Sequence, residues 1–205
     1  RALDFSGVQF FVSGASAFPA ENIREFEAIV GKGKLIEVCG MTETTPIIVA
    51  LPRDGLKKIG SVGMPVSDTE VKLIDPESRK PVPIGEPGEL VARGPQVFTL
   101  GYHNKPEETA NTLRDGWIYT GDVAVMDEAG DLWYRGRADD MFKAAGYRIG
   151  PSEIENCLVK HPAVANAAVV PSPDAERGNV VKAFIVLAPG HEPSGALEDE
   201  LRSHV

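Results

Sequence analysis

An apolar strand, a turn, an amphipathic helix and a second apolar strand follow one another between residues 7 and 38. The first strand is expected at Val8–Val12, and Pro19 is suited to the first turn of the helix. Along that helix Ile23, Phe26, Ile29 and Val30 recur at three- and four-residue spacing, which makes one face apolar. A helix of this kind between two apolar strands is typical of an α/β layer, in which the helix covers a sheet.

A second texture begins after residue 60, where short alternating strands are separated by turn residues. We expect strands at Glu70–Ile74, Gly88–Arg93 and Asp131–Arg135. The segment Asp127–Asp131 is expected to be a hairpin turn, since it lacks the further oxygen ligands of a calcium loop. This region therefore predicts a small β-rich subdomain.

A third texture follows residue 138. We expect a strand at Met141–Ile149, a helix with Glu153 in its first turn, strands at Val164–Val170 and Val180–Leu187, and a terminal helix. The predicted fold class is therefore α/β plus a β-rich subdomain, followed by a small α+β C-terminal domain. The expected regions are 1–75, 76–138 and 139–205.

Composition excludes several classes of protein. The net charge of −9 is spread along the chain, which argues against nucleic acid as a partner and against a basic membrane surface. Cys39 and Cys157 lie far apart, so neither a disulfide framework nor a zinc site is indicated, and we expect free thiols and a cytoplasmic location. No apolar run is long enough for a transmembrane segment. Because an amphipathic stretch reaches Val205, we interpret the chain as a piece of a longer one.

A polar loop follows the expected strand Leu35–Val38. In open α/β sheets, ligands bind at the carboxyl ends of the strands. Residues Thr42–Thr45 place three hydroxyls and one carboxylate in succession, which offers hydrogen-bond donors to phosphate and a hard ligand for magnesium. A solvated Ser/Thr-rich turn is the alternative. By contrast, Gly31–Lys34 lacks Walker spacing and is expected to end a helix.

Several motifs occur in a fixed order along nearly the whole chain. They are Gly40-Met41-Thr42-Glu43, Gly88-Glu89-Leu90, Gly101-Tyr102, Thr120-Gly121-Asp122, Gly136-Arg137-Ala138-Asp139 and Lys143-Ala144-Ala145-Gly146-Tyr147-Arg148. In these motifs the chain resembles the adenylate-forming (AMP-binding) enzyme superfamily, most closely its short- and medium-chain acyl-CoA synthetases, the fatty-acid CoA ligases.

The resemblance implies a partial adenylate-forming fold, in which residues 1–138 end the large N-terminal domain. It implies ATP-dependent activation of a carboxylic acid, with a fatty acid favoured, to an acyl-adenylate. Transfer to CoA would follow, with Mg²⁺ as cofactor. A peptide-synthetase-type adenylation domain and a non-catalytic nucleotide-binding fragment are the alternatives. The family's phosphate loop and late catalytic lysine are expected outside this chain, so we expect the chain alone to be inactive.

The resemblance also assigns residues. The ATP/AMP site would comprise Gly14, Ala15, Ser16, Glu37, Val38, Cys39, Gly40, Met41, Thr42, Asp122, Arg137 and Arg148. The catalytic residues would be Thr42, Glu43 and Lys143, with Glu43 as the metal ligand. CoA would lie along Ala145, Gly146 and Tyr147, and Asp139 would be the hinge.

Two of these assignments carry reservations from the residues themselves. Ser13–Ser16 could equally be a simple strand-to-helix turn. Cys39 stands where the family usually has an aromatic residue, and a thiol offers much less stacking area to adenine. We therefore expect adenine to be held differently or more weakly at this position.

Overall fold

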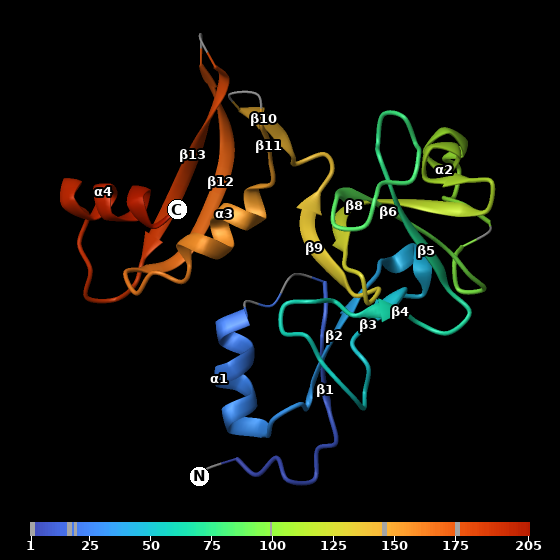
Figure 1. Ribbon diagram of the computed structural model, residues 1–205, viewed down its shortest axis with the longest axis horizontal. Helices are drawn as coiled ribbons and strands as arrows, with labels where there is room; N and C mark the ends of the chain where they lie inside the picture. Colours follow the sequence, from blue (N-terminus) through green and yellow to red (C-terminus); the bar gives the residue numbers. More distant parts are fainter. Residues whose placement is uncertain (1–2, 16–17, 19, 99, 145–146, 175–176) are drawn as a thin grey trace. The chain divides into compact units, whose positions relative to one another are not determined.

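The computed structural model describes residues 3–15, 18, 20–98, 100–144, 147–174 and 177–205. The chain divides into two compact units, Arg1–Tyr134 and Arg135–Val205 (Figure 1). This division lies a few residues before the predicted boundary at residue 138, and the three predicted regions stay a prediction. The two units are described separately below.

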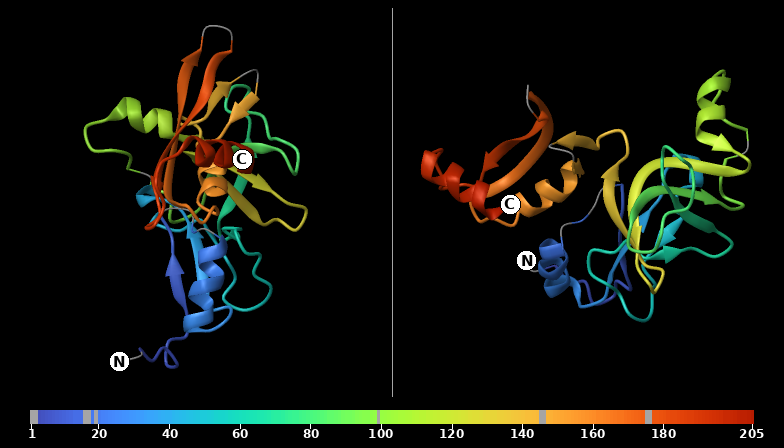
Figure 2. Two further views of the ribbon diagram at one scale, coloured as in Figure 1. Left: turned by 90° about the vertical axis from the view of Figure 1, so that its left-hand side faces the viewer. Right: turned by 45° about the horizontal axis from the view of Figure 1, so that its top comes forward.

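The first unit begins with the predicted strand, helix and strand. Strand β1 (Phe11–Ser13) pairs in parallel with β2 (Leu35–Cys39), and α1 (Ala20–Val30) connects them and lies alongside both (Figure 2). Among the described side chains of α1, Ile23 and Val30 of the predicted apolar face are buried, whereas Ile29 is 73% exposed, so the prediction is wrong for Ile29. The sheet is completed by β3 (Val49–Ala50) and β4 (Met64–Pro65), in the order β1-β2-β3-β4.

The β-rich part of this unit is a five-stranded sheet. Its strands are β5 (Glu70–Ile74), β6 (Pro87–Arg93), β7 (Leu113–Arg114), β8 (Trp117–Met126) and β9 (Leu132–Arg137). The order is β5-β6-β8-β7, and β9 pairs with β8. Helix α2 (Pro106–Thr112) precedes β7. Leu90, Ile118 and Leu132 are fully buried and join Ile48 and Val49 in one core, so the two sheets of this unit share their apolar packing.

The predicted hairpin turn is present between β8 and β9. The backbone N–H of Asp127 donates to the Asp131 carbonyl, and Gly130 takes the left-handed conformation. The Lys58 ammonium lies 2.6 Å from Asp127 Oδ2 and 2.8 Å from Asp131 Oδ2. One lysine thus pairs with both turn carboxylates and offsets part of their negative charge.

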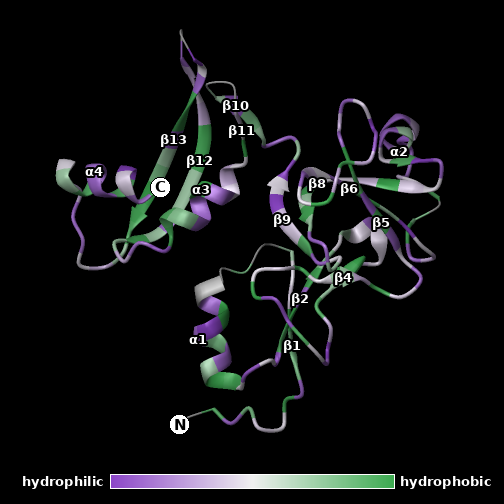
Figure 3. Ribbon diagram, in the orientation of Figure 1, coloured by the Kyte–Doolittle hydropathy of each residue, from purple (hydrophilic) through white to green (hydrophobic). Residues whose placement is uncertain are grey.

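The second unit packs two helices against a long antiparallel ribbon. Helices α3 (Pro151–Leu158) and α4 (Gly195–His204) contribute Leu158 and Leu201 to a core with Val164 and Val169 of the ribbon. The ribbon strands are β12 (Val164–Asp174) and β13 (Gly178–Leu187), both rich in apolar residues (Figure 3). Both predicted strands are therefore present, and both extend to the turn between them.

One expectation for this unit is wrong. Met141–Ile149 is not one strand, because β10 (Phe142–Ala144) and β11 (Tyr147–Ile149) pair with each other antiparallel. Lys143 lies opposite Arg148 in this pairing. Phe142 and Ala144 are buried in the core of the unit while Lys143 is exposed, so the alternating burial of β10 is that of a strand with one covered face.

Membrane-spanning helices were also considered. Within the described ranges, no helix combines the length and the apolarity that crossing a bilayer requires.

Candidate active site

The carboxyl ends of β1 and β2 bring two predicted site segments together. Because the strands are parallel and Ser13 lies opposite Glu37, Gly14 follows directly beside Val38. A Cβ on Gly14 would lie 2.9 Å from Val38 Cγ2 and 3.1 Å from its carbonyl oxygen. Close strand packing therefore favours glycine at this position, whatever its role toward a ligand. Ala15 has a φ of 70°, a left-handed conformation unusual outside glycine, and Ser16 lies outside the described residues.

The loop after β2 is tightly folded around Gly40. A Cβ at this position would lie 1.8 Å from the Pro46 carbonyl oxygen, so only glycine allows the chain to fold back on itself here. A single turn of 3-10 helix, η1 (Thr42–Thr44), follows, and Thr45 then takes a φ of 51°. The loop thus reverses the chain within a few residues and returns it to β3.

The structure corrects the expectation that three hydroxyls of this loop face a ligand. Thr44 is fully buried, and its hydroxyl accepts from the Met41 backbone N–H while lying 2.9 Å and 3.0 Å from the Met41 and Pro46 carbonyls. The Thr45 hydroxyl donates to the carbonyl of Gln96. Thr42 is exposed, and its hydroxyl makes no hydrogen bond within the described part of the chain. Only Thr42 therefore keeps a hydroxyl that is free to contact a ligand.

Glu43 is held at two points by a segment distant in the sequence. Its carbonyl accepts from the Phe98 backbone N–H at 2.9 Å, and its Oε1 accepts from the Tyr102 hydroxyl at 2.5 Å. Burial, together with the bond to Glu43, raises the pKa of Tyr102. The sequence indicates Tyr102 only as part of the Gly101-Tyr102 motif, because no local pattern links this residue to Glu43.

Asp122 is placed by a bulge in β8. The pairing of β6 with β8 shifts between Glu89 and Val91, so the segment Thr120–Asp122 stands opposite Leu90 alone. The Thr120 hydroxyl donates to the Leu90 carbonyl at 2.7 Å and accepts from the Asp122 backbone N–H at 3.0 Å. Gly121 takes a φ of 71°, which suits glycine. Bulges commonly redirect a side chain, and this one sets the position of the Asp122 carboxylate.

Cys39 connects Asp122 electrostatically to the end of β2. Burial, reinforced by the negative charge of Asp122, raises the pKa of the Cys39 thiol to about 12. The thiol therefore stays protonated near neutral pH and is no nucleophile. Cys39 and Met41 also pack against the core of the first unit, so both attach the loop to that core. Asp122 thus belongs to the same neighbourhood as the loop that carries Thr42 and Glu43.

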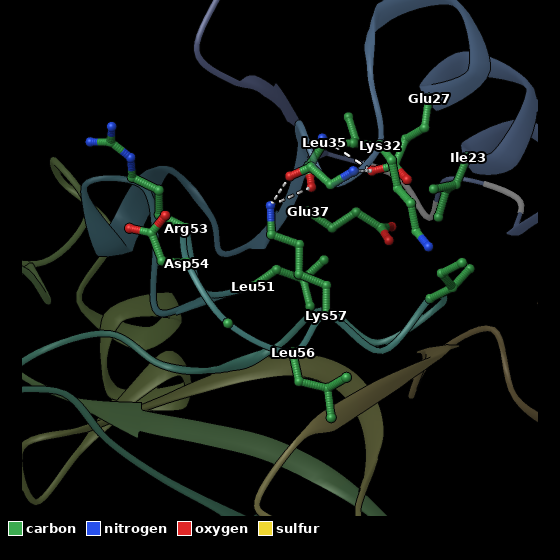
Figure 4. Close-up of a pocket in the computed structure, with 13 residues that line it drawn as sticks. Ile23, Glu27, Lys32, Leu35, Glu37, Leu51, Arg53, Asp54, Leu56 and Lys57 are labelled. Atoms are coloured by element: carbon green, nitrogen blue, oxygen red, sulfur yellow. Dashed lines mark hydrogen bonds between the residues drawn. The ribbon is translucent and has the colours of Figure 1, made fainter.

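Glu37 lies in a hollow of about 540 Å³ between α1 and residues 51–59 (Figure 4). The residue is only 5% exposed, and no described residue bonds its Oε2. Burial raises the pKa of Glu37 to about 7, although a hydrogen bond from the Phe18 backbone opposes that shift. Lys57, in the same hollow, donates instead to the carbonyls of Gly33 and Leu35. Glu37 is the only described member of the predicted site that lines this hollow.

The remaining predicted residues belong to the second unit. The Arg137 guanidinium bonds Asp139 Oδ1 at 3.1 Å, and Asp139 is largely exposed while Arg137 is half-buried. In the β10–β11 pair, Lys143 lies opposite Arg148, and Tyr147 lies opposite Ala144. The Tyr147 side chain is 75% exposed. Ala145 and Gly146 lie outside the described residues, and of Arg148 only the backbone is described. Among the described side chains of this set, Asp139, Lys143 and Tyr147 are exposed.

The side chains near the loop differ in their capacity to bind a metal ion. Among the described residues, no group of three His, Cys, Asp or Glu side chains could enclose an ion. Magnesium, however, is commonly held by one or two carboxylates together with substrate phosphates. Glu43 meets that requirement, because Tyr102 engages only Oε1 and no described residue bonds Oε2. The site therefore fits a magnesium ion brought with a phosphate ligand and not a metal held by protein alone.

The chain is similar in sequence to known protein families. The family model described as "AMP-binding enzyme" matches residues 1–103, and the "AMP-binding enzyme C-terminal domain" model matches residues 153–205. A long-chain-fatty-acid–CoA ligase of Bacillus subtilis is 42% identical over 187 residues, covering 91% of this chain and 33% of that protein. The chain spans about a third of the length of the curated relatives it matches.

Two solved structures are similar along almost the whole chain. The anthranilate CoA ligase AuaEII in complex with anthranoyl-AMP is 36% identical with a TM-score of 0.88, covering 98% of this chain and 38% of that one. The amide bond synthetase McbA from Marinactinospora thermotolerans is 32% identical with a TM-score of 0.87, covering 98% and 40%. The relatives thus share one fold while their names differ in the acid and in the bond formed.

Proposed function

Since the chain belongs to the AMP-binding enzyme family, we propose that it is the nucleotide-holding and small-domain part of an acid–CoA ligase. The full-length protein would convert a carboxylic acid and ATP to an acyl-adenylate and pyrophosphate. It would then transfer the acyl group to CoA and release AMP. The observation that carries this proposal is the meeting of the Gly14 turn, the Thr42–Glu43 loop and Asp122 around the carboxyl end of β2.

The nucleotide would be held by groups of three kinds. Asp122 would accept hydrogen bonds from the ribose hydroxyls, as an acid does in dinucleotide folds, with Arg137 contributing to the same site. The unbonded Oε2 of Glu37 would accept from an amino group of the base. The small residues Gly14, Ala15 and Ser16, with Val38, Cys39, Gly40 and Met41, would border the base. In this proposal the site owes its affinity to polar contacts more than to stacking on Cys39.

Charge on the phosphates would be met by the loop residues and by the small domain. Thr42 would donate a hydrogen bond to phosphate, and Glu43 would hold magnesium, which offsets phosphate charge when bound. Arg148 would contribute a positive charge toward phosphate. These groups position and neutralise, and none of them forms a covalent bond.

The proposed chemistry has two steps. A carboxylate oxygen of the acid bonds to the α-phosphorus as the bond to the bridging oxygen breaks, so pyrophosphate leaves. The CoA thiol then loses its proton and its sulfur bonds to the acyl carbon, while AMP departs with the electron pair of the broken C–O bond. Ala145, Gly146 and Tyr147 would border CoA, Lys143 would act in this second step, and Asp139 would be the point of rotation between the steps.

The acid is proposed only as a class. Similarity to a fatty-acid ligase favours an aliphatic acid, while similarity to an anthranilate ligase supports an aromatic one. In the second candidate function an amine replaces CoA as acceptor, and the resemblance to McbA favours it. A peptide-synthetase-type adenylation domain would load a carrier protein in place of CoA, and a non-catalytic protein would bind the nucleotide without turnover.

A pyrophosphate-release screen of the full-length protein tests the proposal. Purified enzyme is offered ATP, magnesium and acids of graded chain length together with benzoate and anthranilate, and each acid is tested alone, with CoA and with an amine. We expect acid-dependent pyrophosphate release and, with CoA, a stoichiometric acyl-CoA product. Release with every acid at the background rate would reject the ligase assignment, whereas a product formed only with amines would favour amide synthesis.

A substitution at Asp122 tests the site itself. Hydrogen bonds to a charged group contribute about 1.5–3 kcal/mol, so Asp122→Ala in the full-length protein should weaken ATP binding about 10- to 100-fold. Calorimetric titration with ATP measures this loss. Glu86→Ala is the control, because the Glu86 side chain is exposed, lies outside the Glu37 hollow and makes no hydrogen bond within the described residues. Unchanged ATP affinity in the Asp122 variant would remove this residue from the site.

A further inference from the structure

We propose that Tyr102 is a positioning residue that orients the Glu43 carboxylate for magnesium. It would act as the end of a brace formed by Gln96, Phe98 and Tyr102 against the loop that carries Glu43. The inference rests on the proposed function, since it assigns Glu43 the magnesium-binding role.

The brace contacts the loop at three successive points. The Thr45 hydroxyl donates to the Gln96 carbonyl at 3.0 Å, and the Phe98 backbone N–H donates to the Glu43 carbonyl at 2.9 Å. The Tyr102 hydroxyl then donates to Glu43 Oε1 at 2.5 Å. Both the main chain and the side chain of Glu43 are therefore held by one segment, which restricts the rotamers available to the carboxylate.

Tyr102 is itself fixed, so its hydroxyl can serve as a reference point. Its backbone N–H donates to Thr109 Oγ1 at 2.9 Å, and its ring packs against Phe98 with centroids 5.2 Å apart. Gly101 has a φ of 74°, and a Cβ there would lie 2.3 Å from Thr109 Cγ2. The glycine lets the chain pass close to α2, which brings the tyrosine to its place.

The division of the two carboxylate oxygens matches metal binding. Tyr102 engages Oε1, and no described residue bonds Oε2, which is therefore left for a metal. Carboxylates that bind metals are commonly held by a hydrogen bond to the second oxygen, and removing such a partner typically costs 10- to 100-fold in metal affinity or activity. The phenol donates a hydrogen bond and carries no charge, so it orients Glu43 without competing for its negative charge.

The test is the magnesium dependence of Tyr102→Phe in the full-length enzyme. This variant removes only the hydroxyl and keeps the ring against Phe98. We expect half-maximal pyrophosphate release at a magnesium concentration roughly 10-fold higher or more, with an unchanged KM for the acid. Tyr119→Phe is the matched control, because the Tyr119 hydroxyl makes no hydrogen bond within the described ranges, and it should leave the magnesium dependence unchanged.

A double-mutant cycle separates positioning from general stability. In a Glu43→Gln background, Tyr102→Phe should cause no further change in magnesium dependence, since coupled residues are not additive. A merely structural tyrosine would lower Tm in both backgrounds and leave the magnesium constant unchanged, and that result would overturn the proposal. If Tyr102→Phe does not fold, Thr109→Val loosens the Tyr102 backbone and must raise the same constant.

Failure of the proposed function is distinguishable from failure of the brace. If the unmodified enzyme releases no pyrophosphate with any acid, the ligase assignment fails. Magnesium-dependent ATP binding, followed by calorimetry, then replaces turnover as the readout. A magnesium requirement for binding that is roughly 10-fold higher in Tyr102→Phe supports the brace there too, and equal constants in the two proteins overturn it.

Discussion

The Gly40–Pro46 loop and the Arg137–Tyr147 segment carry predicted site residues in opposite surroundings. In the loop, Thr44 is fully buried and its hydroxyl bonds the backbone on both sides. In the other segment, Asp139 and Tyr147 are 72% and 75% exposed, while Arg137 is half-buried. One region is fixed by burial and close packing, whereas the other exposes Asp139, Lys143 and Tyr147 to solvent and buries only Phe142 and Ala144 among its described side chains.

The difference indicates what each region is suited to do. A change of shape in this loop would break the hydrogen bonds of a buried hydroxyl and a close backbone contact, which costs free energy. The loop is therefore preorganised for a ligand. Exposed ion pairs contribute about 0–1 kcal/mol, and regions with little burial open at low free-energy cost. The second region is thus suited to changing partners during a reaction. Three predictions follow from this contrast, in order of decreasing effect.

The first concerns Gly40, the tightest point of the loop. A methyl group there would overlap the Pro46 carbonyl, so Gly40→Ala should lower the free energy of unfolding of the first unit by about 3 kcal/mol. Urea denaturation followed by tryptophan fluorescence measures this, since Trp117 and Trp133 both lie in that unit. Gly7→Ala, where the methyl group meets nothing within 4 Å, should change the value by less than about 0.5 kcal/mol. A loss below about 1 kcal/mol for Gly40→Ala would mean that the loop adjusts freely, and the contrast would fail.

The second concerns Glu37, which is buried beside the loop. Its pKa of about 7 in the folded chain exceeds the ordinary value of 4.5, so the folded state favours the protonated acid. The stabilisation is complete below about pH 4.5 and is lost as pH rises through about 7. Between pH 4.5 and pH 8 the free energy of unfolding of the wild-type chain should therefore fall by about 3 kcal/mol relative to that of Glu37→Gln.

The measurement for Glu37 is the same denaturation at several pH values. The glutamine variant keeps the shape of the side chain and does not titrate, so the difference between the two proteins isolates this carboxyl group. Parallel stability curves for the two proteins would show that Glu37 is hydrated and that its hollow does not fix it.

Much of this architecture was predictable from local sequence patterns. The period of α1 identified its buried residues Ile23 and Val30, and the turn residues delimited β5 and β6 closely. The predicted role of Glu43 came from its place in a motif and is still untested. Such signals are local, because each depends on the spacing of residues within one element.

The rest depended on contacts between distant segments. The Thr45 bond to the Gln96 carbonyl and the Tyr102 bond to Glu43 both follow from the return of the chain past residue 94. The pairing of β10 with β11 was missed because the spacing of residues within Met141–Ile149 does not reveal that its two halves pair with each other.

The smallest predicted effect lies in the exposed region. Proline fixes φ and restricts the preceding residue, so Asp139→Pro in the full-length enzyme should hinder a rotation at this position. We expect acid-dependent pyrophosphate release within about twofold of wild type, and thioester formation slower by about tenfold, which corresponds to about 1.4 kcal/mol in the barrier. Single-turnover assays starting from ATP and from preformed acyl-adenylate measure the two steps separately. Asp139→Ala is the control, because it removes the ion pair with Arg137 but keeps backbone freedom, and both steps should stay near wild type. Equal slowing of both steps by proline would show that this segment is as fixed as the Gly40 loop, and the contrast between the two regions would be lost.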